Sequence, residues 1–391
     1  MKVTFWISLS IIIYTFIGYG LLLYVLVIIR RLLKGKRQIP VLSKEKFPGC
    51  TLVIAAYNEE SIISEKIQNT LSLNYPEGKL EILFITDGST DKTPETVKQY
   101  PDIKLMHQPE RKGKVAALHR AVEQVKTEII IFTDANTLLN KDALMNIAVH
   151  YADKQVGAVA GEKRVHSEER ADAGTAGEGF YWKYESKLKK WDSELFSVVG
   201  AAGELFSVRR NLYQAVPEDT ILDDFMISML IALKGYRIIY EPRAYAVENA
   251  SANIAEELKR KIRIAAGGIQ SILRLKPLLN VFNFGILSFQ YISHRVLRWT
   301  ITPFLLILVL LLNILISLKS DEIIYDLLLA GHSIFYLLAF IGMIFEKREL
   351  RIKIFFIPYY FCVMNYAILA GIKRYIGSQQ SAVWEKAMRK G

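Results

Sequence analysis

Cysteine is nearly absent from this chain. Cys50 and Cys362 are the two cysteines among 391 residues, so the sequence carries neither a disulfide framework nor the cysteine spacing of a zinc site. Such usage is expected for a domain that faces a reducing cytosol. The middle of the chain also lacks a basic stripe interleaved with aromatic residues. We therefore expect no nucleic-acid partner, despite the net charge of +11.

Charged side chains are missing from four long segments, residues 5–29, 299–318, 327–345 and 354–372. Each has about 19 residues or more, which is enough for a helix to cross a hydrocarbon core of about 30 Å. The stretch between the first and second segments, roughly residues 47–279, has the composition of a water-soluble domain. The sequence therefore predicts a multi-pass membrane protein with one N-terminal and about three C-terminal transmembrane helices.

Basic residues beside the apolar segments predict the orientation of the protein. The first segment is followed by Arg30, Arg31, Lys34, Lys36 and Arg37. By the positive-inside rule, these residues keep that end of the helix and the soluble domain in the cytoplasm. The first segment does not resemble a cleaved signal peptide, because its apolar run is too long and no small-residue cleavage site follows it. We expect the protein to reside in the cell membrane.

These features divide the chain into six parts. They are a transmembrane anchor at 1–30, a basic linker at 31–46, a cytoplasmic domain at 47–279, an interface helix at 280–299, transmembrane helices at 300–376 and a basic tail at 377–391. Three C-terminal crossings would place the basic tail outside the cell, against the positive-inside rule. We therefore expect either that the segment at 354–372 is re-entrant or that the interface helix crosses the membrane.

The soluble domain opens with strands that alternate with helices. Strands are predicted at 51–56, 80–86, 103–107 and 129–133, and helices at 61–73, from 94 and at 115–125. This alternation is typical of a mostly parallel, doubly wound α/β sheet. Polar clusters follow three of the strands, at Asn58-Glu59, Asp87-Gly88-Ser89 and Asp134-Ala135-Asn136. In such a sheet the three clusters converge on one edge, where ligands bind.

The second half of the domain is less regular. Strands are predicted at 156–160, at 198–208 with a glycine turn inside, and at 237–241, and helices at 181–190, from 220, at 256–272 and at 281–299. The helix at 256–272 is amphipathic and basic. The helix at 281–299 carries Arg295, Arg298 and Trp299, which suits a helix that lies in the membrane interface.

The strand at 129–133 ends on Asp134, and Asn136 follows two residues later. Two oxygen ligands at the end of a strand suit a hard divalent cation that phosphate oxygens also hold. The alternative is that Asp134 caps the helix that begins near residues 141–142.

Six motifs occur in a characteristic order. They are AYNEE at 56–60, DGSTD at 87–91, GKVAAL at 113–118, TDAN at 133–136, ILDDF at 221–225 and RKIRIAAGG at 260–268. In order and spacing they resemble the family 2 membrane glycosyltransferases, which include cellulose, chitin, hyaluronan and poly-N-acetylglucosamine synthases. The resemblance runs from about residue 53 to about residue 299. It implies a GT-A-like nucleotide-sugar-binding domain between membrane helices.

The resemblance also implies a donor, a cation and a set of site residues. The donor would be a UDP-sugar, with N-acetylglucosamine or glucose as the sugar, and the cation Mg²⁺ or Mn²⁺. Asp224 would be the catalytic base, with Asp223 beside it and Arg263 near the diphosphate. The donor-binding residues would be Ala55, Tyr57, Glu59, Asp87, Gly88, Lys114, Asp134 and Arg260, and the metal ligands would be Asp134 and Asn136.

Several of these residues have simpler interpretations. Lys114 could be a solvated charge at a helix start. Asp223 and Asp224 could be N-terminal helix charges that the macrodipole favours. Arg260 and Arg263 could form the solvated face of a membrane-surface helix.

The sequence also departs from the family pattern at two places. Asn136 stands where the metal motif usually has aspartate, so Asp134 and the donor phosphates would hold most of the cation. The motif that usually reads Gln-x-x-Arg-Trp begins here with Arg260, keeps Arg263 and has Ile264 in place of the tryptophan. In polymerising members that tryptophan supports the acceptor sugar, so its loss raises the alternative of a transferase that adds a single sugar, whereas Tyr181, Trp182 or Trp191 would be other stacking surfaces.

One base, without a second carboxylate set as a nucleophile, predicts a single displacement that inverts an α-linked donor to a β-linked product. We therefore predict an inverting, metal-assisted glycosyltransferase that extends a β-glycan at the lipid bilayer, with an export or accessory subunit as a further partner. The first alternative is a non-processive transferase that adds one sugar to a lipid-linked acceptor. The second is a transporter or scaffold that binds nucleotide without catalysis.

Overall fold

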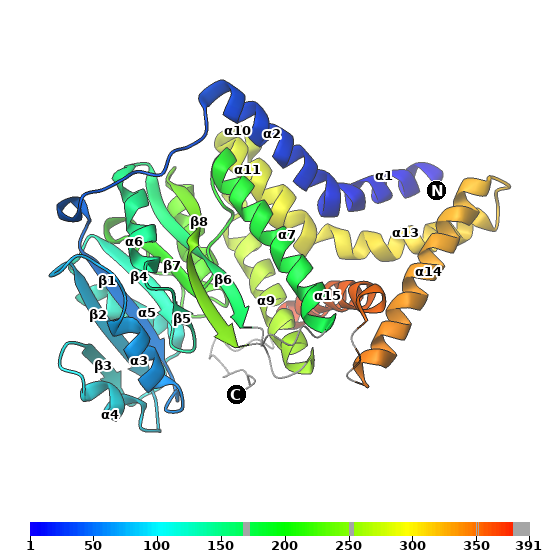
Figure 1. The fold of residues 1–391 in the computed structure, drawn as a ribbon. Coiled ribbons are helices and arrows are strands. Elements are labelled where there is room, and N and C mark those ends of the chain that lie inside the picture. Colours follow the sequence, from blue (N-terminus) through cyan, green and yellow to red (C-terminus); the bar gives the residue numbers. More distant parts are fainter. Residues whose placement is uncertain (167–172, 250–253, 349, 351, 378–391) are drawn as a thin grey trace.

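The computed structural model describes residues 1–166, 173–249, 254–348, 350 and 352–377. Within these residues an eight-stranded sheet forms the centre of the soluble domain, and the apolar helices extend from one side of it (Figure 1). The strands are β1 (Cys50–Ala56), β2 (Leu80–Asp87), β3 (Lys104–Gln108), β4 (Ile129–Asp134), β5 (Leu138–Leu139), β6 (Val156–His166), β7 (Leu205–Arg209) and β8 (Arg237–Asn249).

The first half of the sheet is parallel. β3, β2, β1 and β4 lie side by side in that order, and Val53 of β1 pairs with Leu83 of β2 and Phe132 of β4. The connections contain α3 (Ile63–Leu71), α4 (Thr93–Lys98) and α5 (Lys114–Gln124). Because α5 covers one face of the sheet and α3 the other, the strands are buried on both faces and their sequences are continuously apolar. The predicted α/β domain is confirmed.

The second half of the sheet is mixed, and the alternation of strands and helices that predicts parallel pairing is confined to the first half. β7 runs antiparallel to β4 and to β6, whereas β8 runs parallel to β6. The predicted strand at 198–208 is wrong at its start, because pairing begins only at Leu205. Gly200 has φ +82°, and a Cβ on it would lie 2.1 Å from the Phe225 ring. The glycines therefore form a loop beside the helix that carries Phe225.

Three further helices complete the soluble domain. α8 (Asp223–Leu233) contacts β6 and β8. α7 (Ala173–Leu195) and α9 (Ile254–Arg274) stand between the sheet and the apolar helices (Figure 1). The helices predicted at 181–190 and 256–272 are parts of α7 and α9, which both extend further. The two longer helices therefore connect the soluble domain to the membrane part.

The apolar segments form helices, as predicted. The N-terminal helix runs over Lys2–Lys34 as α1 (Lys2–Ile13), a π-helical turn (Tyr14–Gly18) and α2 (Tyr19–Lys34), and the C-terminal ones are α13 (Ile301–Ser317), α14 (Ile323–Glu346) and α15 (Lys353–Ile376). In the described chain three of these, Lys2–Lys34, α14 and α15, are long and apolar enough to cross a membrane.

The predicted interface helix at 281–299 is broken into short pieces. They are α10 (Val281–Phe284), α11 (Ile286–Tyr291), a π-helical turn (Ile292–Val296) and α12 (Leu297–Trp299). Ile286–Trp299 and α13 meet at a bend of 55°, and together they would form a fourth candidate span. Alone, α13 has 17 residues, about 25 Å of helix, which is short for a bilayer.

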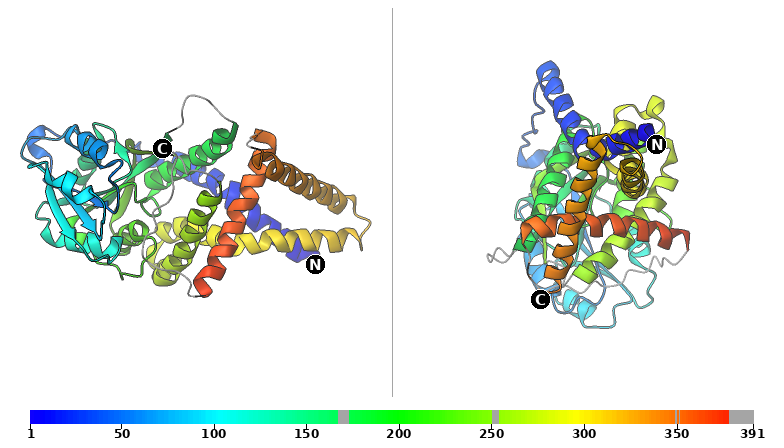
Figure 2. Two further views of the ribbon diagram at one scale, coloured as in Figure 1. Left: turned by 90° about the horizontal axis from the view of Figure 1, so that it is seen from below. Right: turned by 90° about the vertical axis from the view of Figure 1, so that its right-hand side faces the viewer.

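α15 runs across the direction of α13 and not along it (Figure 2). It packs closely on α9, since a Cβ on Gly371 would lie 2.5 Å from Ala265. At its other end, a Cβ on Gly342 of α14 would lie 2.3 Å from the carbonyl oxygen of Phe355. α15 is therefore held beside the soluble domain. The basic tail at 377–391 lies outside the described residues from 378 onward.

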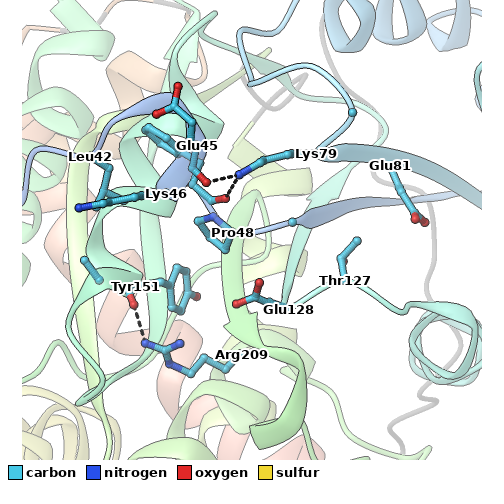
Figure 3. A pocket seen from close by; sticks show the side chains of 14 residues that line it. Leu42, Glu45, Lys46, Pro48, Lys79, Glu81, Thr127, Glu128, Tyr151 and Arg209 are labelled. Carbon is cyan, nitrogen blue, oxygen red and sulfur yellow. Dashed lines mark hydrogen bonds between the residues drawn. The ribbon is translucent and has the colours of Figure 1, made fainter.

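The linker after the anchor is fixed to the amino ends of the strands (Figure 3). Lys79 Nζ donates hydrogen bonds to the carbonyl oxygens of Glu45 and Phe47, at 2.5 and 2.8 Å. Arg209, nearby, donates to the carbonyl oxygen of Tyr151 at 2.8 Å. A cavity of about 440 Å³ remains between these groups. Lys79 and Arg209 thus already bind backbone oxygens, Lys79 those of the linker and Arg209 that of Tyr151.

Candidate active site

A narrow cleft opens at the carboxyl ends of β1, β2 and β4, the edge that the sequence predicts. Its lining includes Ala55, Tyr57, Asp87, Lys114 and Asp134, so five of the predicted donor-binding residues come together there. The cleft holds about 20 Å³. It is small because the Arg111 guanidinium covers the Tyr57 ring at 3.8 Å from the ring centroid.

Asp87 organises the loop that precedes α5. Its Oδ2 accepts hydrogen bonds from the backbone amides of Lys112 and Gly113, at 2.9 and 2.6 Å, and its Oδ1 accepts one from Arg120 at 3.1 Å. Gly88 has φ +71°, and a Cβ on it would lie 2.6 Å from the Arg111 side chain. A carboxylate and a glycine are therefore both needed to hold this loop, and with it the start of α5.

Lys114, the first residue of α5, lies among three carboxylates. Its Nζ is 2.8 Å from Asp134 Oδ1 and 3.9 Å from Asp223 Oδ2. Burial alone would lower the pKa of Lys114, but the charges of Asp134 and Asp223 raise it overall. Lys114 is therefore a partly buried cation held by carboxylates, and not a solvated charge at a helix start. Asp134 is bound to it and does not cap α6 (Ala143–Ala148), whose N-cap residue is Asp142.

Asp224 faces the same space from the first turn of α8. A Cβ on Gly203 would lie 3.4 Å from Asp224 Oδ2 and 3.5 Å from Lys114 Nζ, so both groups border this glycine. Its Oδ1 accepts a hydrogen bond from the Phe225 amide at 2.8 Å. Burial, and then the charge of Asp223, raise the pKa of Asp224 to about 7, against the opposing effect of Lys114. Such a carboxyl can accept a proton near neutral pH.

A larger cavity of about 530 Å³ begins at Lys114 and Asp134 and continues past Asp223 and Asp224. We call it the main cavity. Its walls include Arg260 and Arg263 of α9, and its far end is formed by side chains of α15 and of the anchor helix. The predicted catalytic residues therefore share one cavity with α9, as the spacing of the motifs indicates.

Some predicted residues occupy other places. Within the described chain, Glu59 and Asn136 are not among the side chains that line the cleft or the main cavity. Glu59 is 1 % exposed and its amide donates to Thr93 Oγ1 at 2.9 Å. Ile264, which replaces the family tryptophan, does line the main cavity.

Sequence reasoning missed several charged residues of the site. Lys163 of β6 contacts both Glu204, at 2.6 Å, and Glu248 of β8. Burial alone would raise the pKa of Glu204, but Lys163 lowers it well below its usual range. Lys66 of α3 is buried beneath the metal motif, where its Nζ donates to the Thr137 carbonyl oxygen at 2.6 Å. A carboxylate directly after the Gly200–Gly203 turn was the available signal for Glu204.

The oxygen ligands near Lys114 fit a hard divalent cation in part. In the described part of the chain, no group of three or more His, Cys, Asp or Glu side chains could hold a metal ion. Asp134 lies in both the cleft and the main cavity, and Asp223 Oδ2 is buried there without a hydrogen-bond partner in the described structure. Carboxylate oxygens suit Mg²⁺ or Mn²⁺, and the remaining ligands would have to come from a bound phosphate group.

Comparison with known proteins gives this fold and site a family context. Residues 51–216 match the model of glycosyl transferase family 2. A poly-β-1,6-N-acetyl-D-glucosamine synthase of Staphylococcus aureus is 29% identical over 247 residues, which are 60% of this chain and 58% of that protein. A second, from Staphylococcus epidermidis, is 28% identical over 284 residues, 69% and 68% of the two chains. The chain thus spans less than two thirds of the Staphylococcus aureus relative.

The fold also has a solved counterpart. The structure of the mannosyltransferase PcManGT from Pyrobaculum calidifontis, in complex with GDP-Man and Mn²⁺, superposes with a TM-score of 0.71 and covers 96% of this chain and 100% of that one, at 24% sequence identity. This likeness confirms the GT-A-like architecture. Residues 51–216 therefore match glycosyl transferase family 2, and the chain resembles the poly-N-acetylglucosamine synthases in sequence.

Proposed function

We propose that this protein transfers N-acetylglucosamine from UDP-N-acetylglucosamine to an acceptor hydroxyl, with inversion at the anomeric carbon. The observation that carries the proposal is the position of Asp224. Its carboxylate lies in the main cavity, next to the cation Lys114 and with its pKa raised to about 7 by burial and by Asp223. The sugar is inferred from the names of the relatives, which are N-acetylglucosamine polymer synthases.

The reaction forms one bond and breaks one. The acceptor oxygen bonds to the anomeric carbon, and Asp224 takes the hydroxyl proton. The bond from that carbon to the β-phosphate oxygen breaks, and its electron pair leaves with UDP. Lys114 and Arg263, both in the main cavity, would stabilise the growing charge on the diphosphate. With one base and one displacement, an α-linked donor gives a β-linked product.

Asp134 is the residue that would hold a divalent cation, whereas Asn136, which the sequence predicts as a second oxygen ligand, is not among the described side chains that line the cleft or the main cavity. Mg²⁺ or Mn²⁺ would neutralise charge on the diphosphate when bound. Support comes from the Mn²⁺ in the mannosyltransferase complex and from the position of Asp134, which lies in both the cleft and the main cavity. Lys114, now 2.8 Å from Asp134, would then be free to approach a phosphate.

The nucleoside would bind in the cleft beside Tyr57, Ala55 and Gly88. Because the Arg111 guanidinium covers the Tyr57 ring at 3.8 Å, Arg111 must leave that ring when a base stacks on it. Asp87 would hold the loop before α5 and so place Lys114, while Arg260, paired with Glu257 at 3.0 Å, would support the wall beside the donor.

Two acceptors fit this reaction. A growing β-glycan is supported by the names of the relatives. A lipid-linked acceptor that receives one sugar is supported by the extent of the main cavity, which reaches side chains of α15 and of the anchor. In both cases the soluble domain would face the cytoplasm, where nucleotide sugars are made, and an accessory subunit could receive the product.

The test is UDP release by the full-length protein in detergent, with Mg²⁺ or Mn²⁺, over a panel of UDP-sugars and GDP-mannose. We expect release with UDP-N-acetylglucosamine, and loss of release when the cation is chelated. Sizing of the product separates long chains from single additions. Donor binding without UDP release, under every donor and cation, would refute catalysis and favour the non-catalytic transporter.

A further inference from the structure

The two ends of the main cavity differ in chemistry. The catalytic end carries the carboxylates Asp134, Asp223 and Asp224 around Lys114. The other end is lined by three cations, Lys189 of α7, Arg295 of the π-helical turn and Arg298 of α12, with the carboxylate Glu185, and the charges of Glu204 and Lys163 also act on Lys189. We call these three cations the basic cluster. The cavity is therefore acidic where the chemistry takes place and basic at a second position.

The basic cluster is only partly neutralised by the protein. Glu185 accepts contacts from Arg295 at 3.0 Å and Arg298 at 3.1 Å, and also from His294 at 3.1 Å. Lys189 is in no ion pair among the described residues, and burial lowers its pKa. The Nε of Arg295 is buried and has no hydrogen-bond partner in the described structure. Partly buried cations such as Lys189 and Arg295 favour an anionic ligand.

Apolar side chains begin where the basic cluster ends. Phe16 of the anchor and Ile357, Phe361, Met364 and Ile368 of α15 line the same cavity. Tyr184, next to Glu185, donates a hydrogen bond to the Phe16 carbonyl oxygen at 2.9 Å, and the Phe16 and Phe361 rings are 5.0 Å apart. Both helices are apolar enough to contact a bilayer. This end therefore suits a hydrocarbon chain.

Trp299 lies between the catalytic end and the basic cluster. Its ring centroid is 5.6 Å from that of Phe225, the neighbour of Asp224, and Arg295 lies 5.4 Å from it on the other side. It is seated on Gly268 of α9, where a Cβ would lie 2.5 Å from the indole. One aromatic ring therefore separates the proposed base from the basic cluster.

We propose that the acceptor is an anionic amphiphile: a sugar joined through a phosphate or diphosphate to a hydrocarbon chain. The sugar hydroxyl would lie at Asp224, its ring at Trp299, the phosphate at the basic cluster and the chain along α15. This inference rests on the proposed function and adds the class of acceptor to it. A neutral glycan would leave the pairing of the basic cluster to Glu185, which contacts Arg295 and Arg298.

The test compares acceptors that differ by one part, with the full-length protein and UDP-N-acetylglucosamine. The probes are N-acetylglucosamine linked by diphosphate to farnesol, dodecyl N-acetylglucosaminide without phosphate, N-acetylglucosamine 1-phosphate without a chain, and a β-linked N-acetylglucosamine oligomer. We expect the farnesyl diphosphate compound to have the highest kcat/KM, by about tenfold or more over each of the others, because charge-assisted hydrogen bonds contribute on that scale.

Variants assign the preference to the cluster. Lys189→Gln should lower the ratio of kcat/KM for the phosphorylated over the unphosphorylated lipid by about tenfold. Lys187→Gln, an exposed lysine of the same helix outside the cavity, should leave both rates unchanged. Equal turnover of the oligomer or of the dodecyl compound, or an unchanged ratio in Lys189→Gln, would overturn the acceptor class. Absence of UDP release with every acceptor and with water would instead refute the proposed function.

Discussion

Asp224→Asn is the substitution that tests the proposed mechanism most directly. Asparagine has nearly the same shape, and its Oδ1 can still accept the hydrogen bond that the Phe225 amide donates to Asp224 at 2.8 Å. The amide cannot take a proton from the acceptor. A positioned general base contributes roughly 10²–10⁴ in rate, so kcat should fall by that factor while UDP-N-acetylglucosamine binding remains close to wild type.

The structure also predicts that this variant folds. Asp224 is partly buried beside Asp223, and desolvation and that negative charge both disfavour its ionised form. The amide removes the repulsion and leaves the 2.8 Å pair between Lys114 and Asp134 in place. The melting temperature should therefore be at or slightly above that of the wild type.

The assay is UDP release at saturating donor, with donor affinity measured separately by calorimetry. Asp219→Asn is the matched control, since Asp219 is an exposed carboxylate five residues earlier that pairs with Arg274 at 2.6 Å, and it should retain wild-type activity. A residual rate above about a tenth of wild type in Asp224→Asn would contradict the base assignment, because a base contributes at least about a hundredfold.

Three further predictions follow from the same geometry. The pKa of Asp224 is raised to about 7 and only its ionised form accepts a proton, so kcat/KM should increase as the pH rises through about 7; a profile that is flat across this range would contradict the base role. Gly268→Ala should destabilise the protein by roughly 1–3 kcal/mol, measured by thermal unfolding, because its Cβ would lie 2.5 Å from Trp299; an unchanged stability would mean that the indole moves freely. We expect that α15 does not cross the membrane, because it runs across the direction of α13 (Figure 2). A cysteine placed at Gly377, after α15, should then react with an impermeant maleimide from the same membrane side as one at Lys44 of the linker. Labelling from the opposite side would show that α15 crosses.

The parallel half of the sheet could be predicted from sequence because its signals are local. Each strand is a short apolar run that ends in a polar cluster, and the run is buried on both faces, as at Ile129–Asp134. The cluster residues Tyr57, Asp87 and Asp134 meet at one edge because parallel strands share their carboxyl ends. Local pattern therefore sufficed for the donor end of the site.

The mixed half of the sheet could not be predicted in the same way. The stretch at 198–208 has strand composition throughout, yet only Leu205–Arg209 pairs. The difference is made by Gly200 at φ +82°, in contact with Phe225, and this contact is 25 residues away in the chain. Antiparallel pairing of β7 with β4 likewise depends on tertiary contacts that no short window contains.

The acceptor end of the site could be predicted least from the sequence, because its residues come from distant segments of the chain. The ring of Trp299, the cation Lys189 and the aromatic Phe361 come from α12, α7 and α15, which the sequence places in an interface helix, a soluble helix and a membrane span. In the sequence, the loss of the family tryptophan at Ile264 raises the alternative of a single-sugar transferase, and the other candidate rings are Tyr181, Trp182 and Trp191. In the structure, Trp299 lies in the same cavity as Ile264 and is seated there by Gly268. An aromatic ring is therefore present in the cavity that holds Asp224, even though position 264 is isoleucine. Whether the protein extends a chain or adds a single sugar then depends on which acceptor can bind at the basic cluster and along α15.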